Sequence, residues 1–102
     1  MRSADSESSD VPVVHNPEAQ RFEATVDGQC AFAAYRLHNG TIVFTHTEVP
    51  PALQGRGVAG ALARTALEYA RGAGLDVLPA CPFIASYIRR HRQHEPPVRA
   101  SH

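Results

Sequence analysis

VPPALQGRGVAGALA, residues 49–63 of the chain, joins a predicted strand to a predicted helix. Two prolines end a run rich in β-branched residues, and a turn containing Gly55, Gly57 and Gly60 leads into an alanine- and leucine-rich helical pattern. A helix that begins directly after a strand and a glycine-rich turn presents unpaired backbone N–H groups and the positive end of its dipole. The stretch therefore predicts an anion site suited to phosphate or pyrophosphate.

Strand-like segments precede this turn. Asp27-Gly28 and Asn39-Gly40 are strong signals for tight hairpin turns, and they separate runs that alternate or are rich in β-branched residues. Three strands joined by two such turns predict an antiparallel meander. The predicted strands are residues 21–26, 29–37 and 41–49.

The chain after the turn predicts a helix over residues 56–71, a short strand over residues 76–80 and a second helix over residues 83–91. Gly72 and Gly74 are stop signals for the first helix, and Pro82 suits the first turn of the second. A strand–helix–strand unit places the new strand parallel to the preceding one. The order β-β-β-α-β-α predicts an α/β fold with a mixed sheet.

At 102 residues the chain is long enough for one domain, which we expect at residues 17–95. Residues 1–16 are expected to form a disordered tail, with a weak edge-strand signal at residues 11–14, and residues 96–102 a frayed tail. Ten arginines balance ten acidic residues, so no strongly basic face for nucleic acid is expected.

The sequence shows no signal-peptide pattern and no apolar run near the roughly 20 residues of a membrane span. It therefore predicts a cytoplasmic protein without a membrane partner. Cys30 and Cys81 are expected to be free thiols, with Cys30 in the core. His91 and His94 share a helical spacing but lack a third ligand, so no metal is expected.

The letters QGRGVA match the Q/R-x-x-G-x-G/A signature of Gcn5-related N-acetyltransferases (GNATs), with Gln54, Gly57 and Ala59 in its three defining places. The run HTEVPPALQGRGVAGAL, followed by LPACPFIASYIRRH, resembles the small YjdJ-type branch of that superfamily. The resemblance covers residues 22–94. It implies a compact GNAT-like fold with a splayed sheet, and acetyl-CoA as the cosubstrate.

The resemblance implies that backbone amides of the turn hold the pyrophosphate of acetyl-CoA. Gly57 has no Cβ, so backbone can approach a phosphate there, and Arg56 can add a counter-charge. The pantetheine arm is implied to pair with backbone at Thr47 and Val49. The alternative is a structural turn without a ligand. The predicted cofactor-binding residues are Thr47, Val49, Gln54, Gly55, Arg56, Gly57, Val58, Ala59 and Gly60.

Four residues are candidates for the chemistry. Cys81 ends a strand before a helix N-terminus, a position that favours a nucleophilic thiolate, or it is a small residue filling a corner. His46 and Glu48 alternate on one strand face, so either can serve as a base or activate Cys81, or both are solvated residues. The resemblance implies that Tyr87 protonates the CoA sulfur; the alternative is a core aromatic.

These residues predict an N-acetyltransferase-like protein that transfers an acetyl group to an unidentified amine, on a small molecule or a protein, via or beside Cys81. The alternative is a CoA-binding module with little catalysis. Full-size relatives carry a helical insertion between the first two strands, whereas Asp27-Gly28 makes a tight turn here. The resulting open acceptor side is compatible with a homodimer. A nucleotide binder of another class is disfavoured, because the turn lacks the Lys-Ser/Thr of a P-loop.

Overall fold

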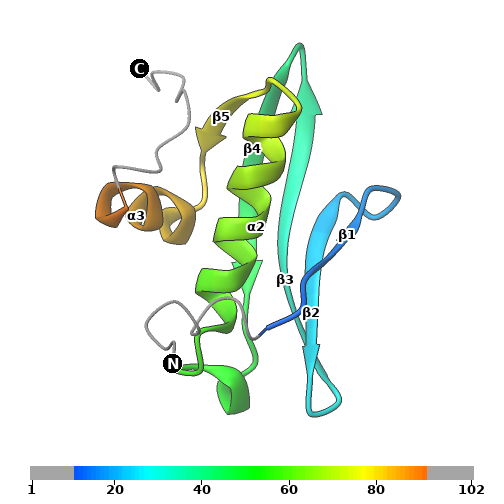
Figure 1. Ribbon diagram of the computed structural model, residues 1–102, viewed down its shortest axis with the longest axis vertical. Coiled ribbons are helices and arrows are strands. Elements are labelled where there is room, and N and C mark those ends of the chain that lie inside the picture. The colour runs from blue at the N-terminus through cyan, green and yellow to red at the C-terminus, as the bar shows by residue number, and fades with distance from the viewer. Residues whose placement is uncertain (1–10, 92–102) are drawn as a thin grey trace.

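The computed structural model describes residues 11–91, which form five strands and two α-helices (Figure 1). The strands are β1 (Val14–Asn16), β2 (Arg21–Val26), β3 (Gln29–His38), β4 (Thr41–Glu48) and β5 (Asp76–Pro79). A short 3-10 helix, η1 (Pro51–Leu53), follows β4, and the α-helices are α2 (Val58–Gly72) and α3 (Pro82–Arg90). The predicted α/β fold is confirmed.

The strands form one mixed sheet in the order β1-β2-β3-β4-β5. The first four strands are antiparallel neighbours, and β5 runs parallel to β4. Both predicted hairpins are present, with positive φ at Asp27 and Gly28 (52° and 77°) and at Asn39 and Gly40 (51° and 78°). Two consecutive positive φ angles match the strand twist and set the β2–β3 and β3–β4 registers.

Helix α2 lies along one face of the sheet, which we call the inner face; the opposite side is the outer face (Figure 1). Alanines on both elements allow close approach of helix and sheet: Ala63, Ala66 and Ala70 of α2 are fully buried, as are Ala31 and Ala33 of β3. Helix α3 adds Ile84 and Ile88 to the same core. The larger buried side chains of the sheet are Phe22, Tyr35, Ile42, Phe44 and Val77.

The first strand corrects the prediction for the N-terminal region. Residues 14–16 were expected in a disordered tail, with an edge strand at residues 11–14, but β1 spans Val14–Asn16 and pairs with β2. A turn in which the Gln20 N–H donates to the Pro17 carbonyl at 3.1 Å returns the chain onto the sheet. The ring of His15 stacks on Phe22 at 4.3 Å, which anchors the strand. The predicted tails at residues 1–10 and 96–102, and His94, lie outside the described residues.

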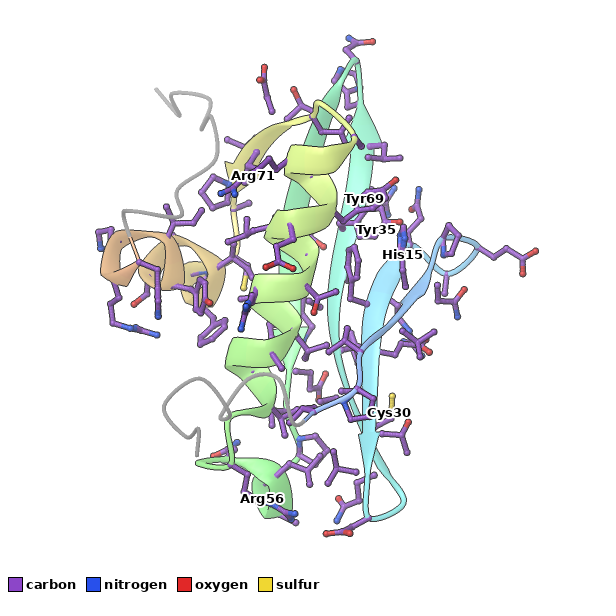
Figure 2. The ribbon with its side chains drawn as sticks, in the orientation of Figure 1. His15, Cys30, Tyr35, Arg56, Tyr69 and Arg71 are labelled. Carbon is purple, nitrogen blue, oxygen red and sulfur yellow. The ribbon has the colours of Figure 1, made fainter. Side chains whose placement is uncertain are left out.

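Cys30 is exposed, so its predicted place in the core is wrong. The two faces of β3 both contain small apolar residues, and sequence alternation alone did not distinguish them. Cys30 pairs with exposed Thr25, whereas Ala31 pairs with buried Ala24 on the inner face. The thiol therefore lies on the outer face, remote from α2 (Figure 2).

Candidate functional site

The sheet opens where β4 and β5 separate. Their pairing ends at Phe44 opposite Pro79, and the Cys81 N–H donates to the Phe44 carbonyl at 2.8 Å. Strand β4 continues to Glu48, and no strand within residues 11–91 pairs with the edge of its last four residues on this side. Proline at the end of β5 has no N–H with which to extend the ladder. The predicted splay is present, and it leaves an extended backbone segment open to a ligand.

A β-bulge lies at the start of the open segment. Phe44 is opposite Tyr35, but His46 is opposite Ala34, so Thr45 is an extra residue in β4. Its hydroxyl donates to the Ala34 carbonyl at 3.4 Å. An extra residue shifts the alternation of side chains by one position. Each of the three residues after Thr45 therefore points to the opposite face of the sheet from the one it would occupy if β4 continued regularly through Thr45.

On the inner side of the opening, Cys81 lies next to Thr47. Thr47 is paired with buried Ala33 and so faces inward. The Cys81 thiol donates to the Thr47 hydroxyl with an S···O distance of 3.4 Å, and Cys81 is only 4% exposed. Cys81 is also the residue before the first turn of α3, where Pro82 begins the helix as predicted. The thiol is therefore held in a corner between β4 and α3.

On the outer side, His46 and Glu48 lie together as predicted. His46 Nε2 is 3.2 Å from Glu48 Oε1, and the two side chains are 61% and 63% exposed. The His46 ring lies 6.0 Å from that of Phe32, an outer-face residue of β3. The bulge places both residues on the face of the sheet opposite to Thr47, so the structure does not bring them next to Cys81.

The glycine-rich turn is held at three points. Leu53 of η1 is 1% exposed and anchors the turn in the core. The Gln54 side-chain amide donates to the Val49 carbonyl at 3.1 Å. Arg56 Nη1 lies 3.1 Å from Asp27 Oδ2 of the β2–β3 hairpin, so its guanidinium is already paired. These contacts fix the turn relative to the end of β4 (Arg56 is labelled in Figure 2).

The N-terminus of α2 is suited to an anion. Gly57 is the N-cap with φ 79°, no side chain caps the helix, and its first turn has no acidic residue. The helical ladder starts with the Ala61 N–H, which donates to the Gly57 carbonyl at 3.0 Å, so the N–H groups before it have no partner within the helix. A Cβ at Gly55 would meet no atom within 4 Å, which shows that this side of the turn is open. The donors present fit a pyrophosphate.

Tyr87 of α3 lies next to the first turn of α2. A Cβ added at Gly60, in the first turn of α2, would come within 3.9 Å of Tyr87 Cε2. The Tyr87 ring stacks on His91 with centroids 4.0 Å apart and an interplanar angle of 17°. Tyr87 is half-buried, so its ring contributes to packing while it faces the start of α2.

Sequence reasoning missed Thr45, because the eight residues of β4, most of them β-branched or polar, contain no local signal for an extra residue. It also missed Arg21, whose guanidinium carbon lies 4.6 Å from the centroid of the Phe32 ring. Arg21 Nε is 2.6 Å from Glu23 Oε2, which also accepts from the Asn16 amide at 3.2 Å. The Arg21 hydrogen bond, and then that of Asn16, lowers the pKa of the Glu23 carboxyl.

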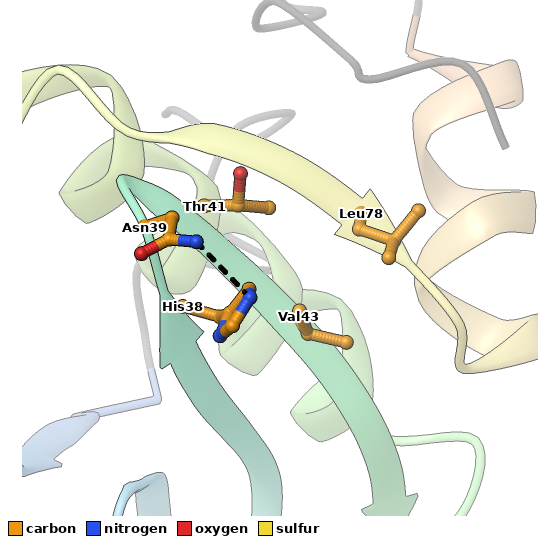
Figure 3. Close-up of a pocket in the computed structure, with 5 residues that line it drawn as sticks. All are labelled: His38, Asn39, Thr41, Val43 and Leu78. Atoms are coloured by element: carbon orange, nitrogen blue, oxygen red, sulfur yellow. Dashed lines mark hydrogen bonds between the residues drawn. The ribbon is translucent and has the colours of Figure 1, made fainter.

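A depression of about 220 Å³ lies at the other end of β4 (Figure 3). The side chains of His38 and Asn39, which both line it, contact each other at 3.2 Å. The lining residues are His38, Asn39, Thr41, Val43 and Leu78. None of them was a predicted site residue. Within residues 11–91, no helix is long and apolar enough to span a membrane, and no three His, Cys, Asp or Glu side chains gather as metal ligands.

Comparison with known proteins gives a consistent result. A family model described as GCN5-related N-acetyl-transferase matches residues 21–96. The protein NATD1 of Xenopus tropicalis is 31% identical over 88 residues, which cover 82% of this chain and 80% of that protein. The protein NATD1 of Mus musculus is 30% identical over 92 residues, covering 87% and 84% of the two chains.

Proposed function

The chain belongs to the GCN5-related N-acetyltransferase family, and on that premise we propose that it binds acetyl-CoA and transfers the acetyl group to an amine. The observation that carries this proposal is the open edge of β4 next to an uncapped helix N-terminus. Both lie within one short segment, from Thr45 to the first turn of α2. The YjdJ-type branch stays a prediction.

In this proposal the N-terminus of α2 holds the pyrophosphate, with the amides of Val58, Ala59 and Gly60 as donors. Gly55 and Gly57 supply the positive φ angles (81° and 79°) that the turn needs. The pantetheine arm extends along the open edge of β4 and pairs with backbone near Thr47 and Val49, as an added strand would. Binding at this edge satisfies backbone groups that β5 leaves without a strand partner.

The chemistry is direct transfer. Bound acetyl-CoA supplies an acetyl thioester, whose carbon bonds to the amine nitrogen as the C–S bond breaks. The exposed His46–Glu48 pair takes the proton that the amine loses, and Tyr87 donates a proton to the departing thiolate. Cys81 lies beside the reacting atoms and orients Thr47. Direct transfer fits the structure better than a covalent route, since the hydrogen-bond partner of the Cys81 thiol is a hydroxyl and not a base.

Calorimetric titration with acetyl-CoA tests binding, and the absence of binding would contradict the proposal. Mass spectrometry after incubation with acetyl-CoA then separates the two mechanisms. Direct transfer predicts no stable acetyl adduct, whereas a covalent route predicts one that disappears in Cys81→Ala and persists in Cys30→Ala. Cys30 is the matched control because its thiol is exposed on the other face. His46→Gln should lower kcat about 100-fold without weakening acetyl-CoA binding.

A second candidate function is a CoA-binding module with little catalysis. The specific observation in its favour is that both connections before β3 are tight turns, at residues 17–20 and 27–28. The described chain therefore has no helical insertion there to enclose an acceptor. Tight acetyl-CoA binding without turnover across a broad panel of amines and peptides would favour this function over the enzyme.

A further inference from the structure

The outer face beside the proposed base carries an aromatic ring between two carboxylates. Phe32 of β3 is directly paired with Glu23 of β2 on one side and Glu48 of β4 on the other. Directly paired residues share a face, so the three side chains form a row across the sheet. Phe32 is half-buried but is not packed against the core. It is therefore available as the floor of a surface site next to His46.

One half of this row already holds a cation. The guanidinium of Arg21 lies over the Phe32 ring, with Cζ 4.6 Å from its centroid, and forms an ion pair with Glu23 at 2.6 Å. A cation above an aromatic face is stabilised by the ring quadrupole. The chain's own arginine thus shows how a positive group sits between Phe32 and a carboxylate.

On the other half, within residues 11–91, no arginine lies over the ring or pairs with the carboxylate. Glu48 is paired with His46, which is uncharged when it serves as a base, and both side chains are more than half exposed. The charges of Arg21 and Glu23 cancel, so the row retains the single negative charge of Glu48. One ammonium group complements this charge, whereas a second one would meet Arg21.

We propose that this row is the acceptor subsite, that it takes a monocationic amine over Phe32 and against Glu48, and that Arg21 disfavours a second positive charge. The inference rests on the proposed function, because it takes His46 and Glu48 as the groups that receive the proton. It assigns Phe32 a binding role and Arg21 a role in specificity. The acceptor then approaches from the outer face, while acetyl-CoA lies along the edge and the inner face.

The test is an NMR titration of the CoA-saturated protein with pentylamine and with 1,5-diaminopentane, which differ by one ammonium group. Pentylamine should shift the backbone amides of Phe32, His46 and Glu48. In Arg21→Gln, the affinity of the diamine relative to the monoamine should rise about two- to fivefold, because Glu23 and one side of the ring become free. Arg36→Gln is the matched control, since it removes the same charge from the same face and should leave the ratio unchanged.

Phe32→Leu should weaken pentylamine binding about two- to fivefold and leave the affinity for CoA unchanged. The inference would be overturned if the ratio of diamine to monoamine affinity were unchanged in Arg21→Gln, or if the amines shifted amides elsewhere in the protein. The proposed function would still stand in either case, provided that CoA binds. If CoA does not bind, the proposed function fails, and the same titration of the unliganded protein still tests the row. Shifts that follow protein dilution would instead assign this face to contacts between copies of the chain.

Discussion

The two ends of the β3–β4 pair differ in how their side chains are used. At one end Tyr35 and Phe44 lie opposite each other, both at most 3% exposed, and aromatic rings from three further elements join them in one cluster (His15, Tyr35 and Tyr69 are labelled in Figure 2). The rings of His15 and Phe22 contact Tyr35, and the ring of Tyr69 contacts those of His15 and Phe22. We call this region the closed end. At the open end, beyond Thr45, the strand has an unpaired edge and exposed His46 and Glu48.

The difference shows that one small domain can place stability and ligand binding in separate regions of the same strand pair. The closed end buries large rings and contributes stability, whereas the open end leaves backbone and ionisable groups available for a ligand. One strand pair serves both purposes because the bulge separates them. Substitutions at the two ends should therefore affect different measurements.

The largest effect is expected at the closed end. Phe22→Ala removes a fully buried ring from the core and should lower the free energy of unfolding by about 3–5 kcal/mol. Phe32→Ala, on the half-buried outer face, should lower it by only about 1 kcal/mol. Urea denaturation of both variants measures this contrast. Equal losses of unfolding free energy in the two variants would contradict the distinction between a stabilising inner face and an outer face that contributes little to stability.

The next effect concerns the open end. Gly57→Ala places a side chain at φ 79°, which costs about 1–2 kcal/mol, and should weaken CoA binding about tenfold because the turn can no longer present its amides. Gly74→Ala imposes comparable strain at φ 70° after the end of α2 and should leave CoA affinity unchanged. Calorimetry on both variants, with thermal melts as a measure of stability, separates strain from loss of the site.

A smaller effect is expected from acid at the closed end. Burial lowers the pKa of His15 from its ordinary value of 6.5, so the unfolded chain binds this proton at a higher pH than the folded chain does. The free energy of unfolding should therefore decrease as the pH falls from 7.5 to 5.5, a window above the titration of Glu23, whose pKa is lowered. His15→Phe keeps an aromatic ring on Phe22 and should flatten the profile. Urea denaturation at each pH measures it.

His38→Gln is the control for that experiment, because His38 is the exposed last residue of β3 and contacts Asn39 of the β3–β4 turn. Its pH profile should match that of the unmodified chain. A profile that flattens in His38→Gln and not in His15→Phe would place the acid sensitivity outside the closed end.

The smallest effect is expected where the Asp27 carboxylate competes with a ligand for Arg56. Asp27→Asn should release the guanidinium and tighten CoA binding about two- to threefold at low salt, because the pair is largely exposed. The gain should disappear at high ionic strength. Weaker CoA binding in this variant would mean that the ion pair holds the turn in its binding conformation.

Local signals in the sequence predicted most of the fold. The Asp27-Gly28 and Asn39-Gly40 turns define their hairpins through residues that tolerate positive φ, and β2 was predicted without error. Residues 49–63 likewise place a strand end, a turn and a helix start in one short stretch. The predicted helix began two residues early, because positive φ at Gly57 makes it the N-cap of α2.

What could not be predicted depends on contacts between distant residues. The face of Cys30 is set by the packing of α2 on Ala31 and Ala33, and β1 is held by the stacking of His15 on Phe22. His46 is separated from Cys81 by a register shift between β3 and β4. No single position in the sequence signals that shift. The site residues were thus identified by residue type and spacing, but their arrangement in space depends on how the strands of the sheet pair.

The bulge at Thr45 makes the geometry of the open end sensitive to strand register rather than to chemistry. Deleting Thr45 would leave His46 opposite Ala34, and so on the outer face. If Thr45 instead paired with Ala34, His46 would lie opposite Ala33 and face Cys81, and Thr47 would move to the outer face. A slip of one residue between two strands, without any change in residue identity, is therefore a route by which this fold can acquire a cysteine–histidine pair.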